Sequence, residues 1–159
     1  MKTIKIEIKW AVLFAIMMLL WMLMEKLLGL HDEHIDKHMV YTNFVAIPAI
    51  LMYVFALLDK RKNFYNGVMT YGQAFTSGLI MSLIIAVLTP LTQYITSTVI
   101  TPNYFANVIE YAVAEGMMTQ TDAEAYFNLQ NYIIQSTVFA PVMGIITTLL
   151  VGLFVRKKA

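Results

Sequence analysis

The sequence has no cysteine among its 159 residues, which excludes disulfide bonds, a thiolate nucleophile and cysteine-ligated metal. Charged residues are also scarce, at 13% of the chain against about 25% in soluble globular proteins. The net charge of +1 gives no basis for binding nucleic acid. The chain also lacks the GxSxG, Walker and GxGxxG motifs of common hydrolase and nucleotide sites.

Apolar residues, by contrast, make up 59% of the chain, and the mean hydropathy is +0.67. A soluble domain of this size exposes much of its surface and could not bury so many apolar side chains. We therefore expect an all-α fold in one membrane domain over residues 1–159, a bundle of four transmembrane helices with the lipid bilayer as its solvent.

Four apolar stretches are long enough to cross about 30 Å of hydrocarbon, which takes about 20 helical residues. They cover residues 8–30, 41–58, 72–100 and 132–155. The first is too long for a signal peptide, contains Trp10 and Trp21, and has no small-residue cleavage site. Pro48, Pro90 and Pro141 should each loosen one backbone hydrogen bond within the later spans.

The basic residues predict the orientation. Nine of the eleven lie on the side that the two chain ends share: Lys2, Lys5, Lys9, Lys60, Arg61, Lys62, Arg156, Lys157 and Lys158. Because lysine and arginine concentrate in cytoplasmic segments, both termini should be cytoplasmic. The loop at residues 31–38 and the segment at residues 101–131 should then face outward.

The outward segment shows helical periodicity. Tyr104, Phe105, Val108, Ile109 and Ala112 share one face, which predicts a short amphipathic helix lying at the membrane surface. Gly116 is expected to end it. A capping box from Thr121 to Glu124 is expected to start a second helix that could run straight into the fourth span, so helical structure is predicted over about residues 103–131.

Spans three and four each carry small residues at every fourth position. Since residues four apart share a helix face, these stripes allow two helices to pack closely in lipid, within one chain or between chains. The stripes are Ala74, Gly78, Ser82 and Ala86 in span three, and Ser136, Ala140, Gly144, Thr148 and Gly152 in span four.

The outer halves of the spans contain most of their polar side chains. Glu25 lies about 7 Å below the outer end of span one, and an ionisable group at that depth is a functional candidate. We consider a polar ligand pocket formed by Glu25, Asn43, Gln93 and Gln135. The alternative is that these groups only hydrogen-bond one another or are solvated.

All three histidines, His31, His34 and His38, lie in the octet HDEHIDKH. On a helix they would lie within about 60° of one another and could hold Zn²⁺. Within the octet, HIDKH lacks the glutamate that the metalloprotease motif HExxH requires after its first histidine, so protease chemistry is excluded. A pH-responsive cluster and a plain solvated turn are the alternatives, so no cofactor is firmly implied.

Several runs carry a family resemblance: EKLLGLHDEHIDKH, YTNFVAIPAI, MTYGQAFTSGLI, LTPLTQYITSTVITPNYF and MTQTDAEAYFNL. Together they resemble a bacterial membrane family common in Bacteroidetes, the domain of unknown function DUF4199. The resemblance covers nearly the whole chain and implies a four-span inner-membrane protein with both termini inside. It implies no activity and no catalytic residues.

Three functional hypotheses remain open. The first is a structural, adaptor or regulatory membrane subunit, with a second copy or another membrane protein as partner. The second is binding or transport of a small ligand, lipid or ion through the outer polar pocket. The third is a metal-dependent membrane enzyme that uses the histidine loop. The absence of a catalytic motif leans against an enzyme.

Overall fold

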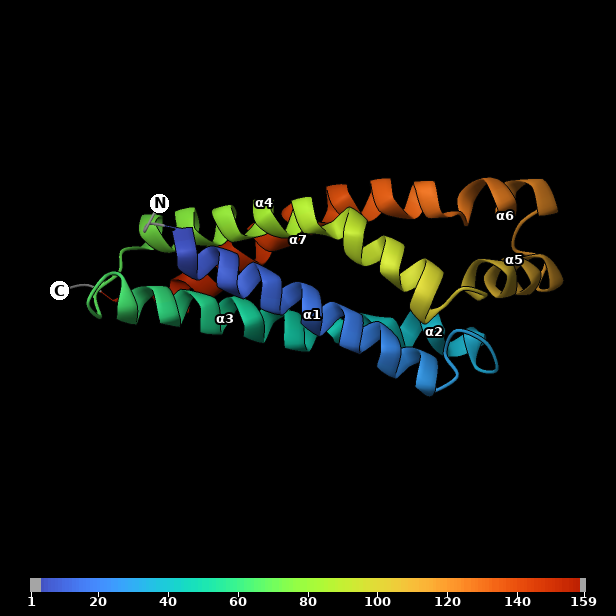
Figure 1. The fold of residues 1–159 in the computed structure, drawn as a ribbon, viewed down its shortest axis with the longest axis horizontal. Coiled ribbons are helices and arrows are strands. Elements are labelled where there is room, and N and C mark those ends of the chain that lie inside the picture. Colours follow the sequence, from blue (N-terminus) through green and yellow to red (C-terminus); the bar gives the residue numbers. More distant parts are fainter. Residues whose placement is uncertain (1–3, 158–159) are drawn as a thin grey trace.

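The computed structural model describes residues 4–157 and shows an elongated bundle of long helices capped at one end by short ones (Figure 1). The start of α1 and the end of α7 lie at the same end of the bundle, which we call the terminal end. The short helices lie at the opposite, capped end. Lys2 and Lys158, used above in the orientation argument, lie outside the described residues.

The elements follow one another without any strand within residues 4–157. They are α1 (Lys5–Leu27), α2 (Ile35–Tyr41), the 3₁₀ turn η2 (Thr42–Val45), α3 (Ala46–Asn63), α4 (Tyr71–Ile95), the π-helical turn η3 (Thr96–Ile100), α5 (Tyr104–Ala114), α6 (Gln120–Tyr126) and α7 (Leu129–Val155). An isolated antiparallel bridge joins Met69 to Lys157 at the terminal end.

Four helical stretches are long and apolar enough to cross a membrane, so the predicted four-span helical bundle is confirmed. They are Lys5–Leu27, Ile35–Asn63, Tyr71–Ile100 and Leu129–Val155. The second is longer than predicted because α2, η2 and α3 follow one another directly. Helix α3 also continues past residue 58, where the predicted span ends, so Lys60, Arg61 and Lys62 lie in its last turn, where cations complement the helix dipole, and not in a loop.

The prolines act locally. Pro48 lies in the first turn of α3, directly after the 3₁₀ turn η2. Proline has no backbone N–H, so it cannot donate a hydrogen bond to the carbonyl four residues earlier, and the α-helical bonding pattern is interrupted there. Pro90 lies inside α4, and this helix changes direction in its second half (Figure 1). Pro141 lies inside α7. The helices thus continue through the last two prolines.

The most extensive helix contact joins α4 to α7 through the small-residue stripes. A Cβ added to Gly78 would lie 2.3 Å from Thr148, and one added to Gly144 would lie 2.2 Å from the Ser82 hydroxyl. Gly152 lies against Tyr71 and Ala74. These close approaches place the two stripes against each other within one chain.

The capping segment differs from the prediction at one boundary. Helix α5 ends at Ala114, and Gly116 follows with a φ of +67°, so the predicted glycine stop is confirmed. The predicted N-cap at Thr121 is wrong, because α6 starts two residues earlier with Thr119 as the N-cap. The Thr119 hydroxyl accepts from the Asp122 amide at 3.2 Å, and Asn128 separately caps α7.

Candidate metal centre

Glu25 is completely buried near the end of α1, at the capped end of the bundle. Its Oε1 accepts a hydrogen bond from the Trp21 indole one turn earlier, at 2.6 Å. Its Oε2 faces away from α1. A carboxylate in such surroundings needs a cationic partner, because burying an unpaired charge costs several kcal/mol.

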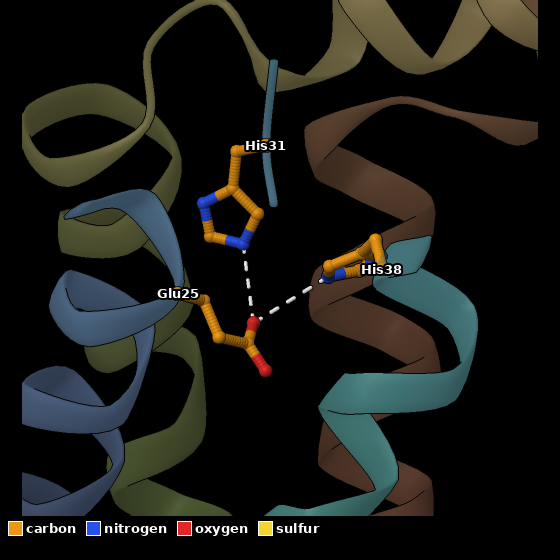
Figure 2. A group of neighbouring side chains, drawn as sticks. All are labelled: Glu25, His31 and His38. Atoms are coloured by element: carbon orange, nitrogen blue, oxygen red, sulfur yellow. Dashed lines mark hydrogen bonds and ion pairs between the residues drawn. The ribbon is translucent and has the colours of Figure 1, made fainter. Parts of the chain in front are cut away.

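Two histidines lie beside this carboxylate. Nε2 of His31 lies 3.1 Å from Oε2 of Glu25, and Nε2 of His38 lies 3.5 Å from the same oxygen. Figure 2 shows the three side chains pointing toward one another from α1, the following turn and α2. His31 is 3% exposed and the side chain of His38 is 17% exposed, so the cluster is largely screened from solvent.

The turn between α1 and α2 folds back over Glu25 and so delivers His31 to it. Gly29 has a φ of +73°, a conformation that favours glycine, and its carbonyl accepts the His34 amide at 2.7 Å. The Leu30 amide donates to the Glu25 carbonyl at 3.0 Å. From α5, the Asn107 side chain donates to the His31 carbonyl at 2.8 Å, which fixes the turn against the cap.

Tyr104 of α5 covers the two imidazoles. Its ring centroid lies 5.2 Å from that of His31 and 5.3 Å from that of His38. The Tyr104 hydroxyl lies 3.5 Å from Nδ1 of His38 and 3.4 Å from the Tyr132 hydroxyl. Burial, and then the neighbouring Tyr132, raise the pKa of Tyr104, so this hydroxyl stays protonated and can act as a hydrogen-bond donor.

The spacing of the donor atoms suits a metal ion. With metal–donor bonds of about 2.0–2.2 Å, neighbouring donors of a tetrahedral site lie about 3.3–3.6 Å apart. The distances from Oε2 of Glu25 to the two Nε2 atoms are close to this range. One donor atom from each of the three residues lies within 4.8 Å of the others.

Two interpretations of the cluster differ in the protonation of its imidazole rings. With protonated imidazoles, the cluster is an ion pair between Glu25 and its histidines. However, the buried Nε2 of His38 has no hydrogen-bond partner, since its contact with Glu25 lacks hydrogen-bond geometry. A neutral imidazole with this nitrogen directed at a carboxylate oxygen is an arrangement that can bind a cation.

The structure combines residues that the sequence analysis had assigned to two different sites. Glu25 came from the proposed ligand pocket, whereas His31 and His38 came from the proposed histidine face. His34 is exposed and does not join them, because α2 begins only at Ile35 and the three histidines share no helix face. The donor set is thus one carboxylate and two imidazoles.

The other pocket candidates lie apart from these three donors. Asn43 is exposed, and its side chain donates to the Met39 carbonyl at 2.7 Å. The Gln93 side chain donates to the Ser97 hydroxyl at 3.1 Å, within α4 and η3. Gln135 is half-buried in α7. Within residues 4–157, no hydrogen bond joins Asn43, Gln93 or Gln135 to Glu25.

A second buried cluster lies at the terminal end, away from the outer halves of the spans, where the sequence predicts most of the polar side chains. Glu7 is 2% exposed; its carboxylate pairs with Lys60 of α3 at 2.8 Å and accepts from Ser77 of α4 at 2.6 Å. Nearby, Lys9 pairs with Asp59. A glutamate inside the first turn of an apolar helix is the signal that could have identified this cluster.

Comparison with known proteins adds one result. A family model described as a protein of unknown function (DUF4199) matches residues 9–157. No curated protein and no solved structure matches the chain. The match covers three of the four candidate membrane-spanning stretches completely, the first from residue 9 onward, and all three donors of the candidate centre.

Proposed function

This chain belongs to the DUF4199 family of unknown function, and we propose that it is a membrane protein that binds one divalent transition-metal ion through Glu25, His31 and His38. The observation that carries the proposal is the convergence of two imidazole nitrogens, Nε2 of His31 and Nε2 of His38, on one carboxylate oxygen, Oε2 of Glu25. The unpartnered Nε2 of His38 supports it, because a bound cation would satisfy that nitrogen.

The donor types favour zinc. Two imidazoles and one carboxylate match the nitrogen and oxygen ligands that Zn²⁺ takes at about 2.0–2.2 Å. Calcium and magnesium prefer shells built from oxygen alone, and copper(I) prefers sulfur ligands. With three protein donors, a tetrahedral ion keeps one position for water or a ligand, which is the arrangement of catalytic rather than structural zinc sites.

Neighbouring residues would hold these donors in place. Trp21 fixes the other oxygen of Glu25, and the Tyr104 hydroxyl faces Nδ1 of His38. Such outer contacts orient metal ligands and raise affinity. Because the donors come from α1, the turn and α2, a bound ion would fasten the capped end of the bundle.

Metal binding can be tested directly on the purified chain. After removal of metal, titration with Co²⁺ should give a visible d–d spectrum that saturates at one ion per chain and is displaced by Zn²⁺. Glu25→Gln and His38→Ala should weaken binding by more than the roughly 10–100-fold that follows loss of an outer contact.

His34→Ala is the matched control, because His34 is exposed and belongs to the same turn. Its affinity should equal that of the unmodified chain. Equal weakening by His34→Ala and His38→Ala, or no stoichiometric binding in the unmodified chain, would contradict the proposal.

The proposal places the centre on the outer side of the membrane, with both chain ends in the cytoplasm. The support is the set of described basic residues at the terminal end, because the K/R excess of short loops and span ends sets orientation. They are Lys5, Lys9, Lys60, Arg61, Lys62, Arg156 and Lys157.

The absence of native cysteine makes this orientation easy to measure. Single cysteines at Glu33 or Glu115, both exposed at the capped end, should react with a membrane-impermeant maleimide in intact expressing cells. A cysteine at Val68, in the loop between α3 and α4, should react only after lysis. The reverse pattern would place the metal centre in the cytoplasm.

A further inference from the structure

An apolar groove of about 430 Å³ lies between α3 and α7, and the site and packing described above do not use it. Thr147 is the polar residue in its lining. Its main apolar contributors are Ile50, Val54 and Leu58 of α3 and Leu150, Val151 and Phe154 of α7. Phe154 is 85% exposed and Leu150 is 58% exposed, so the groove opens onto the surface that faces lipid.

The length of the groove suits one leaflet. Ile50 and Leu58 are separated by about 12 Å along α3, at 1.5 Å per residue. One leaflet contributes about 15 Å of hydrocarbon, half of the bilayer core. An acyl chain entering from the terminal end would therefore fit along the groove without crossing the midplane.

The terminal end of the groove is basic. Arg61 donates a hydrogen bond to the carbonyl of Val155, one of the lining residues, at 2.6 Å. Lys62 extends the groove-lining face of α3 one turn beyond Leu58. Arg156 and Lys157 directly follow α7 and are exposed.

The acidic residues of this end do not neutralise those cations. Glu7 pairs with Lys60, and Asp59 pairs with Lys9. Within residues 4–157, no ion pair includes Arg61, Lys62, Arg156 or Lys157. A cluster of basic side chains therefore borders the terminal end of an apolar groove.

We propose that this groove binds an anionic phospholipid, with an acyl chain between α3 and α7 and its phosphate among Arg61, Lys62 and Arg156. The chemistry matches at both ends, because basic pockets between membrane helices bind anionic headgroups and apolar grooves bind acyl chains. Binding here is independent of the metal centre, which lies at the opposite end of the bundle.

A second copy of the chain fits the groove less well. Close helix pairing in lipid uses small residues, and the small residues of α7 already face α4. The groove rim instead presents the large side chains of Leu150 and Phe154. Such a surface accommodates a flexible chain better than a rigid helix.

Native mass spectrometry of the detergent-purified chain tests the proposal. Phosphatidylglycerol and phosphatidylcholine with identical acyl chains are offered at equal concentration, and phosphatidylglycerol should be retained preferentially. Lys62→Gln combined with Arg156→Gln should reduce that preference by about fivefold for each residue that contacts the headgroup. Arg61→Gln is a second variant, since it also removes the bond to Val155.

Matched controls separate headgroup, groove and general surface effects. Lys26→Gln and Lys37→Gln remove cations at the capped end and should leave the preference unchanged. Leu150→Trp should fill the groove and lower phosphatidylglycerol retention, whereas Leu20→Trp, on an exposed position of α1, should not.

Two outcomes would overturn the proposal. Equal retention of phosphatidylglycerol and phosphatidylcholine would show that the basic cluster does not select an anionic headgroup. Loss of a dimer in Leu150→Trp, with lipid retention unchanged, would assign the groove to a second copy of the chain. Circular dichroism and thermal midpoints would identify a variant that had merely unfolded, and the Lys62 and Arg156 variants, which lie on the surface, would still decide the question.

Discussion

At the scale of single residues, the molecule is defined by two buried carboxylates on one helix. Glu7 and Glu25 lie at opposite ends of α1, and each meets cationic or ionisable side chains from other segments. The two differ in what their partners can do. Lys60 offers only hydrogen-bond donors to its carboxylate, whereas imidazole nitrogens such as those of His31 and His38 can also bind a metal.

Glu7→Gln should destabilise the chain by about 3 kcal/mol, because it leaves the buried Lys60 ammonium without its carboxylate. Reversible unfolding in mixed micelles would measure the loss. The double variant Glu7→Gln with Lys60→Met removes both charges and should recover much of the stability. If the double variant were as unstable as Glu7→Gln, unpaired charge would not be the cause.

The residue scale is also where sequence reasoning was least complete. Glu25 was identified by its depth in span one, but His34 and His38 look equivalent in the sequence. Only the start of α2 at Ile35 and the positive φ of Gly29 decide that His31 and His38 face Glu25 while His34 does not. The partners Glu7 and Lys60 are separated by 53 residues, so no local pattern links them.

At the scale of helices, local sequence patterns predict more of the structure than they do at the scale of single side-chain contacts. The apolar spans follow from runs of about 20 residues, and such runs are visible in any window. Their ends were less certain, since α3 absorbs the basic residues expected in a loop and α6 starts at Gln120 instead of after Thr121. Both differences concern boundaries, where neighbouring residues offer competing caps.

The close pairing of α4 and α7 gives a prediction at this scale. Gly144→Ala should destabilise the bundle by about 1–3 kcal/mol, because the added methyl would overlap Ser82 and the Tyr53 hydroxyl, both within 2.3 Å. Gly72→Ala, in the first turn of α4, has no atom within 4 Å of the added methyl. It should be neutral or stabilise slightly through helix propensity.

Thermal unfolding of the two glycine variants in the same detergent would make the comparison. Equal midpoints for Gly144→Ala and Gly72→Ala would show that α4 and α7 do not approach as closely as the structure places them.

At the scale of the whole molecule, the proposed metal centre would join the short helices of the capped end to the long helices of the bundle. His31 belongs to the turn after α1, His38 to α2, and Asn107 ties α5 to the same turn. A ligand that binds only the folded state stabilises it, by about 2.7 kcal/mol at one hundred times its dissociation constant.

We therefore expect Zn²⁺ to protect the capped end selectively. Hydrogen exchange should slow in the turn between α1 and α2 and in α5, while the loop between α3 and α4 should not change. In Glu25→Gln, Zn²⁺ should slow hydrogen exchange at the capped end no more than it does in the loop between α3 and α4. Uniform protection along the chain, or protection that survives in Glu25→Gln, would argue against a metal at this site.

The ion pair between Glu7 of α1 and Lys60 of α3 also bears on how the chain is made. Helix α1 is synthesised before α3, with the carboxyl of Glu7 already inside an apolar segment. Its partner Lys60 follows 53 residues later, which at about 5–20 residues per second is a delay of roughly 3–10 s. Until α3 has been synthesised, Glu7 lacks the ammonium group that pairs with it in the folded chain. We therefore expect the first two spans to enter the bilayer together as a hairpin.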